Sequence, residues 1–161
     1  MVTTVTAAQP GTDDLSAESQ NDPMVLRMID WRGCSAVEYV PGRVGSHPSF
    51  IGRRIAVEGL VDWIAAGGTC EGFADTFRIA ADAVIEAFRY LDDAPPVEVV
   101  DLTGCPAVRL SARNIPAFRG TQFPVESLFH YLKGGKTAEE FSDTYGLDYD
   151  DIRAVLSHAA A

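Results

Sequence analysis

Apolar residues recur at helical spacing in two separate stretches of the chain. The spacing i, i+3, i+4, i+7 places side chains on one face of a helix. The residues that follow it are Val57, Leu60, Val61 and Ile64 in the first stretch and Val125, Leu128, Phe129 and Leu132 in the second. A glycine pair follows each stretch, at residues 67–68 and 134–135. Glycine adopts the left-handed conformation that ends many helices, so we predict that each amphipathic helix stops there.

A second helix start follows each glycine pair. Thr137 and Glu140 have the spacing of a capping box, in which the threonine caps the helix and the glutamate bonds back to it. Thr69 is the counterpart in the first stretch, but Gly72 stands where the glutamate would be. We therefore predict a second helix in both stretches, with a weaker start in the first.

A third helix is predicted at the end of each stretch. Gly146 punctuates the second stretch, and Asp148 with Asp151 then begins a helix that apolar residues continue. The apolar residues of its counterpart are Val84, Ile85 and Phe88. Three short helices separated by turns are typical of a helix-turn-helix module.

Runs rich in β-forming residues precede the helices. They cover residues 25–31 with 37–40 in the first stretch and residues 97–102 with 108–110 in the second. Gly33 and Gly104 fall where a tight turn would join the two runs of each stretch, so we predict that these runs pair with each other. A second short strand pair is predicted on either side of Gly52 and of Gly120.

The two stretches are copies of one module. Setting Pro48 against Pro116 aligns them without a gap. The matched positions include Phe50 with Phe118, Gly52 with Gly120, Glu58 with Glu126, Thr69 with Thr137, Phe73 with Phe141 and Asp82 with Asp150. Upstream, residues 30–37 match residues 101–108, and a short insertion follows in the first copy. Matches at turn and core positions in the same order indicate a duplication.

The duplication predicts three regions. Residues 1–23 are polar, with too little apolar surface to offset the entropy of ordering, so we expect a disordered tail. Residues 24–93 and 94–161 are the two repeats, each consisting of strands and a three-helix module. Fusing two copies of a module that would otherwise form a twofold dimer predicts a pseudo-dimer within one chain, and a homodimer of the chain is a further assembly to consider.

The composition argues against a membrane-spanning, a secreted and a disulfide-rich protein. No stretch approaches the roughly 20 apolar residues that a membrane span needs. The first residues carry neither a basic segment nor an apolar core of a signal peptide, and three cysteines are too few for a disulfide scaffold, so we expect a cytoplasmic protein with reduced thiols. The net charge of −10 repels nucleic acid, so any such contact would need a locally basic patch.

The segments 48–57 and 116–125 resemble a bacterial family known as domain of unknown function number 433. Its usual pattern is P-x-[IF]-x-G-T-R-[IL]-P-V, then a helix and a G-x-[ST]-x-E-E stretch, which residues 67–71 and 135–140 supply here. Arg53 stands in place of the usual threonine, and Gln122 in place of the arginine. The resemblance implies a mainly α fold with small β elements (α+β), in two tandem homeodomain-like helix-turn-helix modules preceded by short β strands. It also implies kinship with VapB-type antitoxins, whose partners are PIN-like ribonuclease toxins.

The arginines are concentrated in two matching segments. Between Glu38 and Glu58, and again between Asp101 and Glu126, the chain contains no acid. The arginines within these segments are Arg43, Arg53 and Arg54, and Arg109, Arg113 and Arg119. Clustered arginines contact phosphates or an acidic partner, so these six are candidate nucleic-acid-binding residues. The alternative is that they neutralise acidic helices within the molecule or across a dimer.

Acidic residues mark the last helix of each copy. A helix-turn-helix normally places the N-terminal end of this helix in the major groove of DNA. The acids there are Asp148, Asp150 and Asp151 in the second copy and Asp82 and Glu86 in the first. Because they oppose phosphates, we interpret them as candidate contacts for a basic protein partner. The alternative is that they only cap a solvated helix.

No catalytic residue, metal site or cofactor is predicted. His47, His130 and His158 are scattered and lack the spacing of metal ligands. His130 lies one helical turn after Glu126, which predicts a surface pair. The cysteines have no base within sequence reach, and no phosphate-binding or dinucleotide-binding loop is present. We therefore expect a protein that is not an enzyme.

The function that we predict is an antitoxin-like component that neutralises a nuclease-type toxin, with its operator DNA as a second ligand. Two alternatives stay open, namely a DNA-binding transcriptional regulator without a toxin partner and a structural protein-interaction module. Loss of DNA binding on replacing Arg53, Arg54 and Arg119, together with a steep salt dependence, would favour the regulator.

Overall fold

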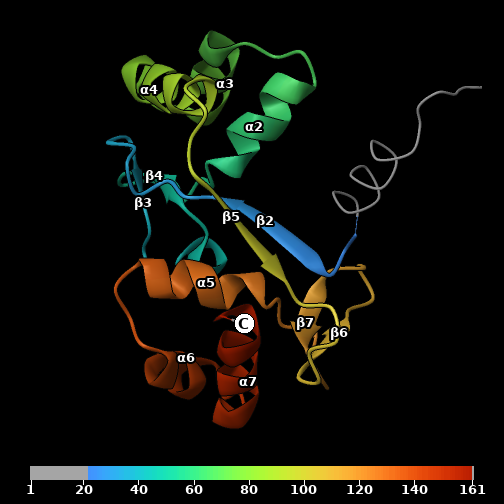
Figure 1. Cartoon of the computed structure of the whole chain (residues 1–161). Helices are drawn as coiled ribbons and strands as arrows, with labels where there is room; N and C mark the ends of the chain where they lie inside the picture. The colour runs from blue at the N-terminus through green and yellow to red at the C-terminus, as the bar shows by residue number, and fades with distance from the viewer. Residues whose placement is uncertain (1–21, 161) are drawn as a thin grey trace, which may run out of the picture.

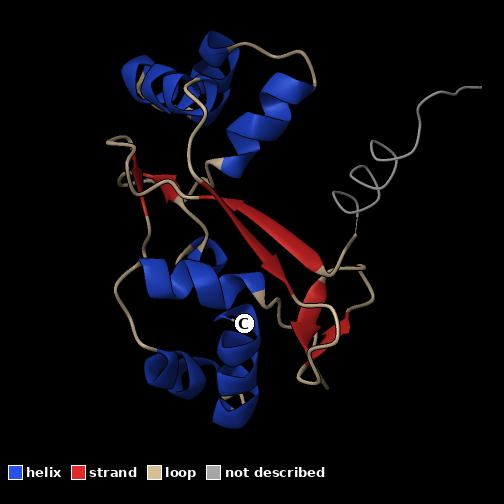
Figure 2. Cartoon of the chain, viewed as in Figure 1, coloured by secondary structure: helices blue, strands red, loops and turns tan. Residues whose placement is uncertain are grey.

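The computed structural model describes residues 22–160, so the predicted tail lies almost wholly outside the described residues. The first half contains β2 (Val25–Ile29), β3 (Val37–Glu38), a single 3-10 turn η1 (Val44–Ser46), β4 (Ser49–Phe50), α2 (Glu58–Ala65), α3 (Cys70–Phe77) and α4 (Ala81–Asp92). The second half contains β5 (Val97–Asp101), β6 (Val108–Leu110), β7 (Pro116–Phe118), α5 (Glu126–Lys133), α6 (Ala138–Tyr145) and α7 (Tyr149–Ala160). The described part of the chain is therefore a mixed α+β fold of two similar halves, each with strands followed by three helices, as predicted (Figure 2).

The helix starts follow the predicted caps. The Thr137 hydroxyl accepts a hydrogen bond from the Glu140 amide at 3.1 Å, and the Glu140 carboxylate accepts one from the Thr137 amide at 3.1 Å, which completes the capping box of α6. Thr69 caps α3 by accepting a hydrogen bond from the Gly72 amide at 3.0 Å, without a returning carboxylate. Both second helices therefore begin where the sequence predicts, and the first has one stabilising contact fewer.

The strand pairing differs from the prediction. The strand β2 pairs with β5 of the other half in an antiparallel register that sets Val25 opposite Asp101 and Ile29 opposite Val97. Pairing of 25–31 with 37–40, and of 97–102 with 108–110, is wrong, because consecutive turns at Cys34 and Cys105 carry the chain away from a hairpin. Instead β3 pairs with β4, and β6 pairs with β7.

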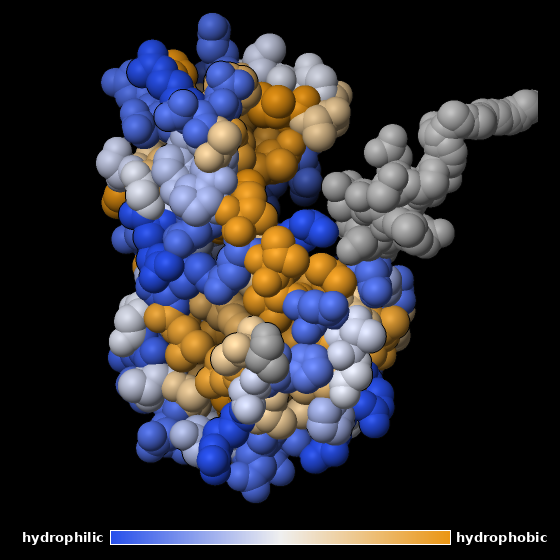
Figure 3. Space-filling view, in the orientation of Figure 1, coloured by the Kyte–Doolittle hydropathy of each residue, from blue (hydrophilic) through white to orange (hydrophobic). Residues whose placement is uncertain are grey.

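The ribbon of β2 and β5 connects the two halves. Figure 1 shows it between helices α2–α4 at one end of the molecule and α5–α7 at the other. One face packs on the second half, where Leu26 and Met28 join the core of α5, α6 and α7. On the opposite face Val97 and Val99 are exposed, and apolar surface gathers over this region in Figure 3. Equivalent strands of the two repeats thus meet around an approximate dyad.

Each half has its own apolar core. The first is built around Trp31, Phe50, Leu60, Phe73 and Val84, all of which are buried. The second has its fully buried counterparts of these residues: Leu102, Phe118, Leu128, Phe141 and Ile152. The same positions of the repeat therefore form both cores.

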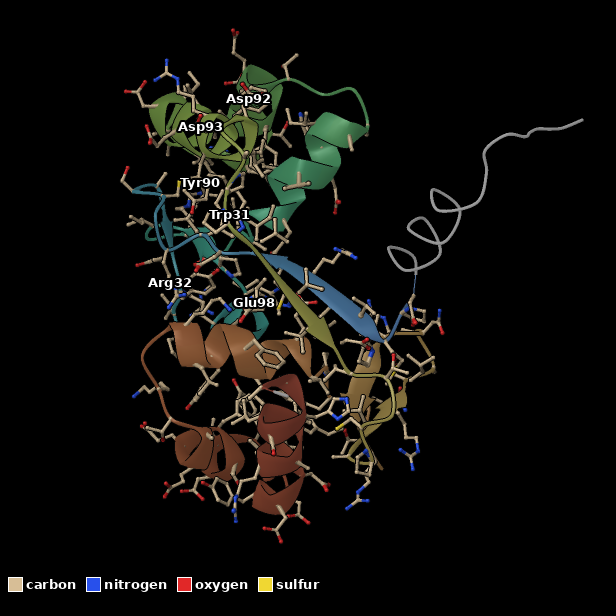
Figure 4. All side chains as sticks on the ribbon, in the orientation of Figure 1. Trp31, Arg32, Tyr90, Asp92, Asp93 and Glu98 are labelled. Atoms are coloured by element: carbon tan, nitrogen blue, oxygen red, sulfur yellow. The ribbon has the colours of Figure 1, made fainter. Side chains whose placement is uncertain are left out.

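The last helix of each half is tied to the turn after its first strand. Trp31 lies next to Tyr90 of α4 in Figure 4, with ring centroids 5.3 Å apart, and the Tyr90 hydroxyl donates to the Asp30 carbonyl. His158 occupies the equivalent place on α7, with its Nε2 3.0 Å from the Thr103 carbonyl oxygen. The longest helices of the described region have 12 residues, and none is long and apolar enough to cross a membrane.

Candidate functional site

Four of the six candidate arginines bind acceptor groups of the protein itself. Arg43 forms a salt bridge with Glu38 at 2.6 Å. The Arg53 guanidinium donates to the carbonyls of Phe77 and Arg78, which end α3. The two that lie in the second half are Arg109, which donates to the Pro106 and Val108 carbonyls, and Arg119, which pairs with Asp151. The alternative in which the arginines neutralise acidic helices therefore agrees with Arg119 alone, because the others bind a strand carboxylate or backbone carbonyls.

Arg54 and Arg113 differ from these four arginines in having no partner for their side chains among the described residues. Both side chains are exposed, and neither makes a hydrogen bond or salt bridge with any residue in the range 22–160. Arg54 lies in the turn after β4, and Arg113 lies in the loop between β6 and β7. These two guanidinium groups are therefore the candidates that are both exposed and unpaired among the described residues.

The acidic residues of the last helices also fall into different environments. Asp148 precedes α7 and accepts a hydrogen bond from the Asp150 amide at 2.8 Å, so it acts as a cap. Asp151 is 8% exposed and its carboxylate is bound to Arg119 at 2.8 Å. Asp82 and Glu86 are exposed on α4, as is Asp150 on α7.

A groove with a volume of about 520 Å³ lies between the turn after β4 and the start of α4. Ile51 and Ile79 contribute apolar surface to it, Asp82 and Glu86 add carboxylates from α4, and Arg53 adds a guanidinium group. The Ile51 side chain is 56% exposed. The groove therefore combines apolar surface with two carboxylates and one guanidinium, and the guanidinium is bound to the carbonyls that end α3.

The corresponding place in the second half is bridged by a salt bridge. Arg119 is the repeat equivalent of Ile51, and Asp151 is the equivalent of Ala83, which also lines the groove. The Arg119 guanidinium binds the Asp151 carboxylate at 2.8 Å across this position. The groove is thus a feature by which the first half departs from its copy.

A second cluster of polar side chains lies between the two halves. Glu58 and Glu126 are the first residues of α2 and α5, at equivalent positions of the repeat. His130 follows one turn later on α5, and His47 lies just after η1. One ligand atom from each of these four residues lies within 4.8 Å of all the others.

The contacts within this histidine–glutamate cluster lie both within each half and between the halves. His130 Nε2 lies 2.9 Å from the Glu126 carboxylate, and His47 Nδ1 lies 3.3 Å from Glu58. His47 Nδ1 also lies 3.7 Å from the carboxylate of Glu126 in the other half. The hydrogen bond to Glu58 raises the pKa of His47 against the opposing effect of its burial. Burial would raise the pKa of Glu126, but the bond from His130 and neighbouring positive charge lower it.

The insertion in the first copy builds one side of the cluster. The turn η1 packs against α5, and Tyr39 stacks on His130 with ring centroids 5.9 Å apart. The ring of His47 lies 4.6 Å from that of His130. His130 is only 1% exposed, and its Nδ1 has no hydrogen-bond partner among the described residues.

The two histidines of this cluster lie far apart in the sequence, so their spacing does not indicate that they meet. The expectation that the histidines lie apart is wrong for His47 and His130, although it holds for His158, which contacts Thr103. The predicted pair of His130 and Glu126 is confirmed, but His130 is buried rather than at the surface. The equivalence of Glu58 with Glu126 was a usable signal, since residues near a dyad approach their own copies.

The comparisons with known proteins identify one family. A family model described as "Protein of unknown function (DUF433)" matches residues 37–91 and 115–159, one match in each half. No curated protein and no solved structure matches the chain.

Proposed function

The chain belongs to the DUF433 family of proteins of unknown function, in two copies, and from this premise we propose that it is a non-enzymatic, antitoxin-like binding protein. Its partner is a nuclease-type toxin of the PIN-like kind, whose basic nucleic-acid cleft it occupies. The single observation that carries this proposal is the groove of the first half, which is lined by apolar residues, two carboxylates and one guanidinium.

The groove suits a protein partner better than a small molecule or a nucleic acid. Ile51 supplies an exposed apolar contact, which protein interfaces bury at their centre. Asp82 and Glu86 flank it with negative charge, and the whole chain carries a net charge of −10. A cleft that binds phosphates is positively charged, so the two surfaces are complementary and attract each other before contact.

Co-expression with the product of the adjacent gene tests the proposal. We expect a stable complex and rescue of growth when the toxin is induced. A complex without rescue would favour the structural interaction module, and the absence of both would refute the antitoxin function.

Charge reversal locates the binding surface. We expect the double variant Asp82→Lys with Glu86→Lys to lose rescue, because like charges would then face each other in the interface. The matched control reverses Glu71 and Asp75, two exposed acids on α3 outside the groove, and should keep rescue.

Operator DNA is the second ligand that we propose, and it rests on Arg54 and Arg113. Their guanidinium groups are exposed and unpaired within the described residues, whereas those of Arg53 and Arg119 are paired with acceptors of the protein. Replacing Arg54 and Arg113 by alanine should weaken DNA binding and reduce its dependence on salt concentration. Absence of DNA binding even at low salt would remove this part of the proposal.

A further inference from the structure

We propose that the histidine–glutamate cluster of His47, Glu58, Glu126 and His130 is a binding site for a divalent transition-metal ion, with zinc as the ion that fits best. Each residue offers one ligand atom, and these four atoms lie within 4.8 Å of one another. Two of the ligands come from each half of the chain. The bound ion would therefore join the two repeats at their dyad.

The spacing of the donors agrees with a four-coordinate ion. Bonds of about 2.0 to 2.1 Å in a tetrahedron place neighbouring ligand atoms about 3.3 Å apart. Three of the four separations between a histidine nitrogen and a glutamate oxygen are 2.9, 3.3 and 3.7 Å. All four ligand atoms lie within 4.8 Å of one another, so side-chain movements of about 1 Å would bring them to ligand distances.

The donor types select the class of ion. Two imidazoles and two carboxylates form an N₂O₂ set, which suits zinc and neighbouring transition metals, whereas calcium and magnesium prefer oxygen alone. The two carboxylates also supply the charge that neutralises a dication. Four protein ligands fill a tetrahedral zinc sphere, as in sites that hold a fold together.

His130 is the buried member of the cluster. Its side chain is 1% exposed, and its Nε2, the nitrogen that faces the other three residues, contacts only a carboxylate of the cluster. A metal ion takes a nitrogen lone pair without requiring the ring to be charged, which suits a buried imidazole. The stacked ring of Tyr39 and the insertion around His47 already hold the imidazoles in place.

The cluster is reachable from solvent on two sides. Glu58, Glu126 and His130 line a cavity of about 220 Å³ beside the ribbon. His47 and Glu126 also line a second cavity of about 400 Å³ near the loop between β6 and β7. An ion therefore has an entry path without opening of either core.

Calorimetric titration of the metal-depleted full chain with zinc chloride tests the site. We expect one ion per chain, release of protons on binding and a higher midpoint of thermal unfolding, because the ion binds the folded state. Cobalt(II), used as a spectroscopic substitute, should give the intense visible bands of a tetrahedral complex. Absence of binding heat and of these bands at a large molar excess of metal would overturn the proposal.

Three variants assign the site to these residues. His47→Ala and Glu58→Gln should each weaken zinc binding by at least about tenfold, and both positions are partly exposed, so folding should survive. The control is His158→Ala, which removes a histidine outside the cluster and should bind zinc like the wild type. Unchanged affinity in both cluster variants would show that zinc binds elsewhere and would overturn the assignment. None of these measurements involves a toxin or DNA, so their outcome is independent of the proposed function.

Discussion

The two halves of the molecule share one fold but differ where the turn after the short strand meets the last helix. In the second half Arg119 and Asp151 join these elements by a salt bridge. In the first half the same positions are Ile51 and Ala83, and a groove lies between them. The second copy thus has a salt bridge between these elements, whereas the first copy has an open groove at the same place.

The halves differ again at the dyad. Glu58 and Glu126 are equivalent, but their neighbours are not: His130 has Asp62 as its counterpart, and His47 has Ile115. The cluster is therefore symmetric in its carboxylates and asymmetric in its imidazoles. A symmetric homodimer would place identical residues there, whereas a fused chain can change each side separately.

The largest expected effect concerns whether the halves unfold together. Leu60→Ala and Leu128→Ala, at equivalent and fully buried positions, should each lower the free energy of unfolding by about 2 to 5 kcal/mol. Because β2 and β5 join the halves, we expect either variant to shift one shared transition in urea, followed by circular dichroism.

The control for this pair is Ile51→Ala, at an exposed position of the first half, which should change the stability by less than about 0.5 kcal/mol. Two separate transitions, with only one of them moved by each leucine variant, would show that the halves are independent.

An intermediate effect is expected at the salt bridge. Arg119→Ala should lower the free energy of unfolding by about 1 to 3 kcal/mol, because Asp151 is mostly buried and would lose its partner. Arg113→Ala, which removes an exposed arginine without a side-chain partner in the described region, is the control and should leave chemical denaturation unchanged.

Transferring the salt bridge to the first half tests whether the groove holds the partner. Ile51→Arg with Ala83→Asp installs the bridge of the second half in the first. This pair should abolish toxin rescue while altering the free energy of unfolding by less than about 1 kcal/mol. Full rescue by this double variant would mean that the groove does not hold the partner.

The smallest expected effect is the difference in stability contributed by the two helix caps. Thr137→Ala and Thr69→Ala should each cost about 1 kcal/mol, with the larger loss at Thr137, since only there does a glutamate complete the capping box. Equal losses in thermal unfolding would show that the returning carboxylate contributes nothing measurable.

The same cap predicts a dependence on pH. The hydrogen bond from the Thr137 amide lowers the pKa of Glu140 below its ordinary value of 4.5. The folded state then binds fewer protons than the unfolded state. The Glu140 carboxylate therefore stabilises the fold at pH values above 4.5, and this stabilisation is lost as the pH falls and the carboxylate is protonated. The stability difference between wild type and Glu140→Gln should accordingly be seen at neutral pH and disappear in acid.

Local structure was predictable from the sequence because its causes are local. Helical spacing, the caps at Thr69 and Thr137, and the glycines after α2 and α5 depend on residues within a few positions of one another. The duplication was also visible, since equivalent positions such as Phe73 and Phe141 preserve the apolar pattern of a shared core.

Pairing and proximity were decided only by the tertiary structure. Strand β2 had a nearby candidate in residues 37–40, yet it pairs with β5, because that register buries Leu26 and Met28 against the second half. No local rule brings His47 to His130 across 83 positions of sequence numbering. The amino-acid order by itself determined the module and its repetition, whereas the burial of one copy against the other decided which polar groups meet.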